Sequence, residues 1–170
     1  MALPMPAGAT PFGLALSPDK RYLAVADNST RAVVLADYHC AKYGCLTDLG
    51  GPYNYGPLSL TFLPDSRRLV IIIPGQVLLL VWDVVANALD RYVAVPNGLI
   101  PRAVCCDPRG GAVLVATDKA LIAFTSEWEY VGVLKDIVNS EICSGAVSIC
   151  PKTLRIAVSD MRRHQVHMIA

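Results

Sequence analysis

The sequence is poor in charged and in aromatic residues. Charged side chains make up 17% of its 170 residues and aromatic side chains 7%, whereas 54% of the residues are hydrophobic. A composition this apolar excludes a disordered chain and predicts a packed core. The net charge is only +1, so no overall field attracts nucleic acid or an anionic membrane, and we expect neither as a partner.

Apolar runs long enough to cross a membrane are also missing. Leu69–Ile73 and Val77–Trp82 are fully apolar, but a Pro-Gly-Gln turn separates them. A spanning helix needs about 20 apolar residues, so these runs predict two buried strands of a hairpin. The first 17 residues have no basic lead and are interrupted by prolines, which argues against a signal peptide. We therefore expect no transmembrane segment and a cytoplasmic location, with the nucleus or an organelle as open alternatives.

Metal-binding patterns are absent as well. The six cysteines contain no C-x-x-C pair, and their C-x4-C and C-x6-C spacings lack the paired arrangement of a structural zinc site. His39 beside Cys40, or His164 with His167, supplies two ligands where zinc needs three or four. We expect no metal, no cofactor and reduced thiols. The alternative is a disulfide between Cys40 and Cys45, which would need an oxidising compartment.

What the sequence does contain is a four-fold repeat. An apolar segment ending near a proline occurs as LALSPD, LTFLPD, VCCDPR and VSICPK, and the prolines are 46, 44 and 43 residues apart. This is close to the period of a propeller blade, about 40–45 residues. Before each proline, large residues alternate with small ones such as Gly13, Ala15, Ser59 and Thr61, which is the period of a β-strand. We interpret the small residues as facing the propeller axis, where bulky side chains do not fit.

Two further apolar strands follow each proline. The third strand of each copy ends at residue 37, 83, 126 or 170, with apolar residues two and four positions before that end. In the third copy these two residues are Ile122 and Phe124. Weaker candidates for an outer, fourth strand are residues 45–49, 92–95 and 131–134.

The predicted fold is therefore all-β and consists of β-propeller blades. Each of the four repeats forms a four-stranded antiparallel sheet, except that the last lacks its outer strand. Residues 1–12 form an N-terminal segment, and the propeller arc spans 13–170, with blades at about 13–50, 56–96, 101–135 and 145–170. The expected inner strands are residues 13–17, 58–63, 102–107 and 145–150. Because propellers of the WD-like kind usually have about seven blades, we expect the arc to be part of a larger propeller. The alternatives are a ring completed by a second copy or a second polypeptide, and a closed ring of four blades.

The strand pattern carries a family resemblance. Residues 62–95, FLPDSRRLVIIIPGQVLLLVWDVVANALDRYVAV, resemble one WD repeat, with Trp82-Asp83 where such repeats carry their Trp-Asp pair. SPDKRYLAVAD in the first copy resembles the strand–turn–strand of WD repeats, and LRIAVSDMRRHQVHMIA in the last copy is similar to the NHL-repeat variant. No copy has the Gly-His pair that often opens a WD repeat.

This resemblance implies a non-catalytic scaffold that mediates protein–protein interaction within a multi-subunit assembly. The alternative is a partial propeller enzyme of the NHL-like lyase or lactonase type, whose site needs blades absent from this chain. The inner strands offer no paired acids or histidines for acid–base chemistry, since Asp107 stands alone at a strand end. We expect Cys105, Cys106 and Cys150, also on inner strands, to be small packing residues. The chain is therefore predicted not to be an enzyme.

Loop aromatics are the first candidates for partner contacts. Tyr53 and Tyr55 lie in the loop before the second blade, and Trp128 and Tyr130 follow the third strand of the third blade. Tyrosine and tryptophan are enriched at interface hot spots. The alternative is that these rings pack beneath their loops.

Basic turns and a bare strand edge are the other candidates. Arg67 and Arg68 lie in a turn between the first and second strands, and such turns share one rim, which would attract an acidic partner. The alternative is a solvated turn. The last strand, residues 165–170, is largely apolar and has no proline or lysine to blunt its edge. We therefore expect a protein partner at this open edge, in contact with Gln165 and His167.

Overall fold

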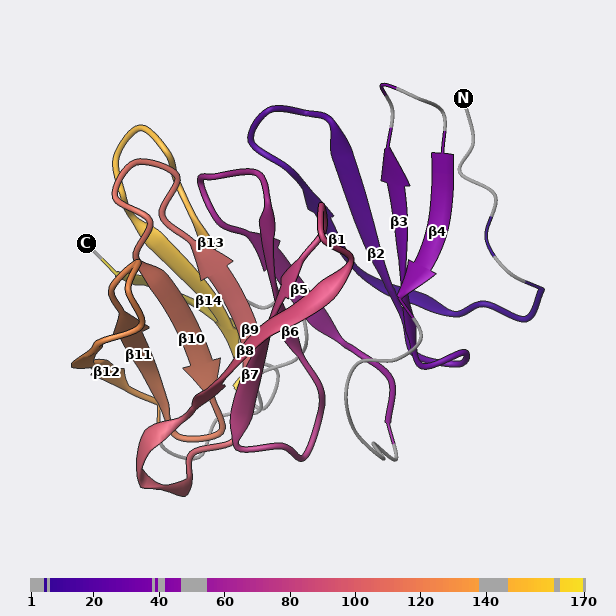
Figure 1. Ribbon diagram of the computed structural model, residues 1–170. Coiled ribbons are helices and arrows are strands. Elements are labelled where there is room, and N and C mark those ends of the chain that lie inside the picture. Colours follow the sequence, from indigo (N-terminus) through magenta and orange to yellow (C-terminus); the bar gives the residue numbers. More distant parts are fainter. Residues whose placement is uncertain are drawn as a thin grey trace.

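The computed structural model describes residues 5, 7–37, 39, 42–46, 55–137, 147–160 and 163–169. Its strands form four antiparallel sheets, three of four strands and one of three, and each sheet follows the order of the chain (Figure 1). The only helical turn among the described residues is the short 3-10 segment Pro96–Gly98. The predicted all-β fold is confirmed.

Each sheet corresponds to one copy of the repeat, and we call it a blade. Blade 1 consists of β1 (Pro11–Leu16), β2 (Tyr22–Asp27), β3 (Ala32–Asp37) and β4 (Lys42–Leu46). Blade 2 consists of β5 (Ser59–Phe62), β6 (Arg68–Ile72), β7 (Leu78–Asp83) and β8 (Ala88–Ala94). Blade 3 consists of β9 (Pro101–Cys106), β10 (Val113–Thr117), β11 (Ala120–Phe124) and β12 (Tyr130–Asp136). Blade 4 consists of β13 (Val147–Ile149), β14 (Ile156–Asp160) and β15 (Gln165–Ile169).

The blades stand next to one another in chain order. The inner strands β1, β5, β9 and β13 contact one another successively (Figure 1). This is the arrangement predicted from the four prolines. The outer strands begin earlier than predicted: β4 starts at Lys42 where residue 45 was expected, and β8 at Ala88 where residue 92 was expected. In β8 most side chains are exposed, so apolar and polar residues do not alternate clearly along it. The sequence therefore gives little sign of where this strand starts.

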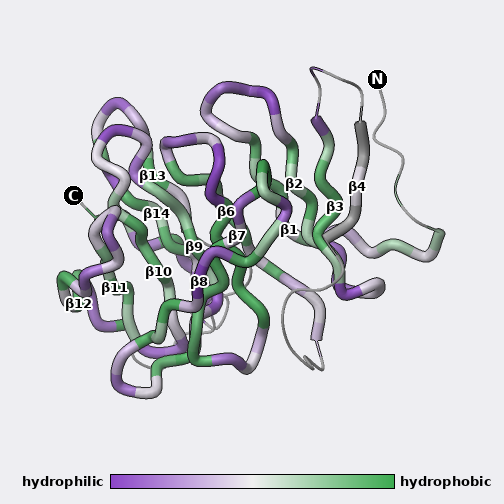
Figure 2. Tube along the Cα trace, in the orientation of Figure 1, coloured by the Kyte–Doolittle hydropathy of each residue, from purple (hydrophilic) through white to green (hydrophobic). Residues whose placement is uncertain are grey.

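Each pair of neighbouring blades shares one apolar core. In Figure 2 much of the tube along the strands of the blades is green, the colour of hydrophobic residues. We call the face of a blade that turns to the preceding blade its N-side face, and the opposite face its C-side face. In the core between blades 1 and 2, Leu60 and Phe62 on the N-side face of blade 2 meet Ala24 and Ala26 on the C-side face of blade 1. Large residues thus pack on small ones.

The other two pairs of neighbouring blades also share a core. Val104 and Val113 of blade 3 share a core with residues of blade 2, and Val147 and Ile156 of blade 4 share one with Ala103 of blade 3. All three cores therefore lie between an N-side face and the C-side face of the blade before it. Blade 2 is the most enclosed described sheet, because both of its faces carry large, fully buried side chains. These include Leu69, Ile71, Ile72, Leu79 and Leu80.

Two small residues of the inner strands, Gly13 and Ser59, lie in contacts between blades, which corrects their interpretation as residues that face the axis. A Cβ on Gly13 would stand 2.6 Å from the carbonyl oxygen of Leu58, which precedes the inner strand of blade 2. Ser59 is buried, and its hydroxyl accepts a hydrogen bond of 3.1 Å from the backbone N–H of Val104 in blade 3. Bulk is excluded because the next blade's backbone is close.

The third strand of blade 3 also needs a correction. Ala123 pairs with Leu114 in the register that joins Leu35 to Ala24 in blade 1, so Ala123 is the structural equivalent of Leu35. The prediction had placed Phe124 there, but Phe124 packs on blade 2. The cause is the turn between the second and third strands, which has four residues in blade 1 and two in blade 3. The strand consequently ends at 124 and not at 126.

Candidate functional site

The four inner strands border a groove of about 600 Å³. Its lining comes from all four blades and includes the repeat prolines Pro18, Pro64 and Pro108. Every residue that lines it is uncharged, and the polar ones are hydroxyl or thiol side chains such as Thr61 and Cys105. The groove can therefore accept apolar or neutral polar groups, but among the described residues it presents no carboxylate, imidazole or ammonium group.

Among the described residues, two adjacent thiols are the only titratable groups along this groove. Cys105 packs against the core between blades 3 and 4, and Cys106 against the core between blades 2 and 3, as predicted for small packing residues. Burial raises the pKa of each thiol to about 12, and the neighbouring charge of Asp107 adds to the effect. Both thiols are therefore protonated near neutral pH and are poor nucleophiles and metal ligands.

Cys150 departs from its prediction as a packing residue, because it is exposed. It lies after β13 in a turn that the Leu154 N–H closes onto the Cys150 carbonyl at 2.8 Å. The side chain of Thr153 hydrogen-bonds the thiol, and with the backbone N–H groups of Thr153 and Lys152 it lowers the pKa of Cys150. The alternation before Pro151 did not reveal this, because the strand ends one residue earlier, at Ile149.

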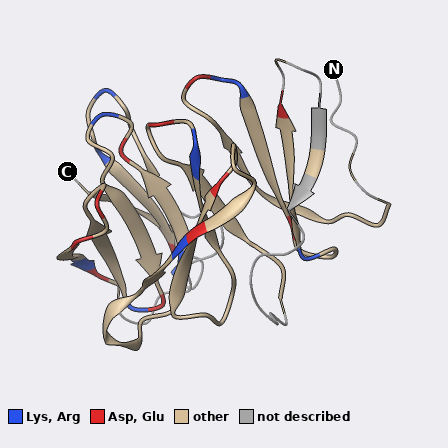
Figure 3. Ribbon diagram, in the orientation of Figure 1, with Lys and Arg blue, Asp and Glu red and all other residues tan. Residues whose placement is uncertain are grey.

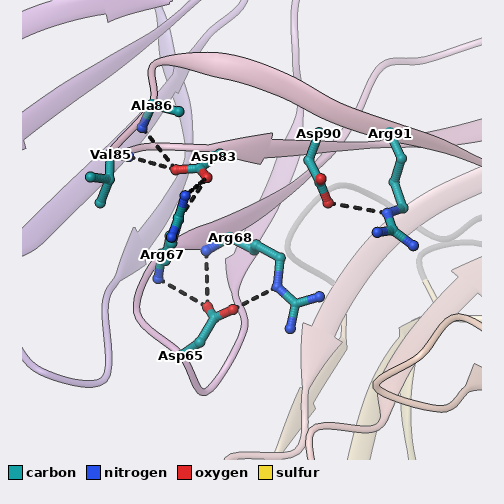
Figure 4. Close-up of polar contacts among 8 residues, drawn as sticks. All are labelled: Asp65, Arg67, Arg68, Asp83, Val85, Ala86, Asp90 and Arg91. Carbon is teal, nitrogen blue, oxygen red and sulfur yellow. Dashed lines mark hydrogen bonds and ion pairs between the residues drawn. The ribbon is translucent and has the colours of Figure 1, made fainter.

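The basic turn of blade 2 is neutralised within the blade (Figure 4). Arg67 Nε donates to Asp83 Oδ2 at 2.6 Å, and Arg68 Nε donates to Asp65 Oδ2 at 2.5 Å. The backbone N–H groups of both arginines also donate to Asp65 Oδ1, each at 2.9 Å. Figure 3 likewise shows acidic and basic segments together in the turns of blades 1 and 2. Arg67 and Arg68 thus lie on a rim where each has a carboxylate partner.

The Arg67–Asp83 pair is a repeated feature that the sequence interpretation missed. In blade 1, Arg21 stands at the same distance from its proline and contacts Asp37 at 2.8 Å. In blade 3 both partners are absent together: Gly111 stands at the position of the arginine and, by strand register, Thr125 stands at the position of the aspartate. The joint presence of an arginine after the proline and an aspartate at the end of the third strand was the available signal.

The loop aromatics divide into exposed and packed rings. Tyr55 is exposed, and Tyr130 is partly exposed with its ring centroid 5.8 Å from that of Phe124. Trp128 packs against the core between blades 2 and 3, so its main contact is the packing alternative. The indole N–H of Trp128 is buried without a hydrogen-bond partner among the described residues. Tyr53 lies outside the described residues.

The edge of blade 4 is held in place by a buried carboxylate. Asp160 has a fully buried side chain, and its Oδ2 lies 3.2 Å from Nε2 of His167 while Oδ1 accepts the backbone N–H of Arg163 at 3.1 Å. Asp27 organises the equivalent turn of blade 1, where it accepts the N–H groups of Thr10 and Ser29. His167 is thus a structural partner of the turn.

The strand β15 pairs with β14 on one side and is the outermost described strand of its sheet. Gln165, at its start, is exposed. Successive turns of each blade lie at alternate ends of its sheet. One end carries Arg67, Arg68 and Trp128, and the opposite end carries Tyr55 and Gln165. The structure therefore does not gather the predicted contact residues into one site.

Comparisons with known proteins add no family to this picture. No protein-family model matches the chain, and no curated protein matches it in sequence. Within the described ranges, no helix is long and apolar enough to cross a membrane. Those same ranges contain no group of three or more His, Cys, Asp or Glu side chains placed to hold a metal ion.

Proposed function

We propose that the chain is a non-catalytic propeller scaffold, of the WD-repeat or NHL-like kind, that binds protein partners within a multi-subunit assembly. The observation that carries this proposal is the uncharged lining of the groove along the inner strands. General acid–base catalysis requires groups that change protonation near the working pH. The two thiols of this groove, with pKa values near 12, do not provide such groups. A cytoplasmic location is part of the proposal.

The partner is proposed to bind at the edge of blade 4. Strand β15 has hydrogen-bond donors and acceptors on its outer side that no described strand engages. An exposed edge of this kind accepts an added strand from another chain. The contact of His167 with the buried Asp160 fixes the edge before binding, which lowers the entropic cost of association. Gln165 lies at the start of this edge and would contact the partner.

The experiment is photo-crosslinking in the cells that produce the protein. A photoreactive phenylalanine derivative replaces Gln165 in one variant and Val131 in the control. Val131 is exposed and lies on β12, the outer strand of a complete four-stranded blade. We expect a defined protein adduct from position 165 that position 131 does not give. Absence of an adduct at 165, or the same adducts at both positions, would contradict the proposed edge.

The lyase or lactonase alternative is tested separately. The purified chain is titrated with Ca²⁺, Mn²⁺ and Zn²⁺ by calorimetry. We expect no heat of specific binding. A stoichiometric ion whose release follows substitution of groove residues such as Thr61 would favour the enzyme and contradict a non-catalytic scaffold.

A further inference from the structure

The turn that follows each repeat proline is capped in one of two ways. In blades 1 and 2 the residue after the proline is an aspartate, Asp19 or Asp65, and its carboxylate accepts one or two backbone N–H groups of the same turn. In blades 3 and 4 the residue before the proline accepts them: it is Asp107 in blade 3 and Cys150 in blade 4. The residue after the proline thus has no capping role in blades 3 and 4.

This change of cap accompanies a reversal of charge. At the position of Asp19 and Asp65, blade 3 has Arg109 and blade 4 has Lys152, and both of these basic side chains are exposed. The turn of blade 4 also carries Arg155, which is exposed as well. The repeat therefore places basic residues at the end of blades 3 and 4 where blades 1 and 2 have carboxylates.

The turn of blade 4 is also one residue longer than those of blades 1 and 2. The Leu154 N–H bonds the carbonyl four residues before it, whereas the N–H groups of Lys20 and Ser66 bond the carbonyl three residues before them. Leu154 stands three residues after the proline, at the position that Arg21 and Arg67 occupy in blades 1 and 2. Blade 4 consequently lacks the arginine–aspartate pair of those blades and exposes a leucine there.

Arg109, Lys152 and Arg155 form a basic cluster at the neighbouring ends of blades 3 and 4 (Figure 3). Their inner strands β9 and β13 are in contact. Besides the hydrogen bond from Thr153, the charge of Arg109 lowers the pKa of Cys150, so its guanidinium lies near the turn of blade 4. None of the three cations lies within ion-pair distance of a carboxylate among the described residues. The cluster is therefore not neutralised within the chain, unlike the basic turn of blade 2.

The surroundings of the basic cluster limit the length of an anion that fits it. Asp107 is the one carboxylate in the two turns, and its Oδ1 accepts the backbone N–H of Arg109. Glu127 and Glu129 flank Trp128, which packs toward blade 2, so they place negative charge on the far side of blade 3. A nucleic acid, with a phosphate at every nucleotide, would extend from the cluster toward these carboxylates. A short acidic segment would not.

We propose that the basic cluster binds a short acidic segment of a partner protein, whose carboxylates pair with Arg109, Lys152 and Arg155. An apolar residue of the segment packs on Leu154, which is 37% exposed between the two cations of blade 4. The chain itself contains an example of the contact, since Arg21 Nε and Nη2 both donate to Asp37 Oδ2, at 3.0 and 2.8 Å. The inference goes beyond the proposed function, because the cluster lies at the end of blade 4 opposite to Gln165.

The test is the fluorescence anisotropy of a labelled peptide of alternating glutamate and leucine residues, titrated with the full 170-residue chain at low salt. We expect saturable binding that added salt weakens. Lys152→Glu and Arg155→Glu should each weaken it about tenfold, because an attractive charge contact becomes repulsive. Lys20→Glu is the matched control: Lys20 is exposed in the corresponding turn of blade 1, so the net charge changes equally while the cluster stays intact. Its effect should be below about twofold.

Lys152→Arg separates a lost charge from a lost fold, because it keeps the charge and should keep the binding. The proposal is overturned if the wild-type chain does not bind the peptide, if a peptide with glutamine in place of glutamate binds equally well, or if Lys20→Glu weakens binding as much as Lys152→Glu. A single-stranded oligonucleotide of equal charge that binds more tightly than the peptide overturns the assignment to a protein segment. The adduct from position 165 tests the proposed function independently, because it should persist in Lys152→Glu.

Discussion

At the scale of the residue, Asp83 joins several contacts at the end of the third strand of blade 2. Its Oδ1 accepts the backbone N–H groups of Val85 and Ala86, each at 2.9 Å, while Oδ2 binds Arg67. The hydrogen bond from the Arg67 guanidinium holds the pKa of Asp83 below its ordinary value, against the opposing effect of burial. The carboxylate therefore stabilises the fold in its charged form.

The first prediction is that Asp83→Asn lowers the free energy of unfolding at pH 7 by about 1 kcal/mol, the upper end for an ion pair with an exposed partner, because the arginine loses its charged partner. Because the folded pKa is lowered, this contribution is present above the unfolded pKa and disappears as the pH falls through the folded value. Urea unfolding should therefore show a difference from wild type at pH 7 that shrinks toward pH 3. Asp90→Asn, in a half-exposed pair with Arg91, is the control and should cost little. Equal losses in the two variants would contradict the argument.

The second prediction concerns the cysteines. Thiolate is the reactive form, so Cys150, with its lowered pKa, should react with iodoacetamide at pH 7.5 well before Cys105 and Cys106, whose pKa values are about 12. Peptide mass spectrometry over a time course measures the three rates. Thr153→Val removes the hydrogen bond to the thiol and should slow the labelling of Cys150. Faster labelling of Cys105 or Cys106 in the folded protein would refute the assignment.

At the scale of the element, the inner strands are limited by their closeness to one another. The third prediction is that Gly13→Ala destabilises the protein by about 1–3 kcal/mol, the usual cost of overpacking, because the added methyl group would stand 2.6 Å from the Leu58 carbonyl oxygen. Gly44→Ala on β4 is the matched control, since nothing lies within 4 Å of its added methyl group. Thermal unfolding measures both variants. A loss at Gly44 as large as that at Gly13 would contradict the role of the inter-blade contact.

The predictability of the elements from sequence follows the strength of their burial pattern. The inner strands could be predicted because large and small residues alternate before each proline, and the second strands because apolar residues recur five and seven positions after it. The third strand of blade 3 was misaligned because its turn is two residues shorter, and a shift of one residue exchanges the two faces. The Arg67–Asp83 pair was missed because its partners are 16 residues apart and meet only across neighbouring strands.

At the scale of the whole molecule, every described core belongs to two blades at once. The apolar side chains of a blade are buried against a neighbouring blade, so each blade is stable only when its neighbours are folded. Such a chain follows the thermodynamics of a one-dimensional array, in which stability is the sum of nearest-neighbour couplings. Blades 2 and 3 have two couplings each, whereas blades 1 and 4 have one within the chain.

Amide hydrogen exchange makes this gradient visible. The amides of β6 and β10 should exchange last, and those of β14 first, because opening blade 4 breaks one coupling and opening blade 2 breaks two. Because each core is shared, unfolding of this chain should begin at an end blade and proceed inward.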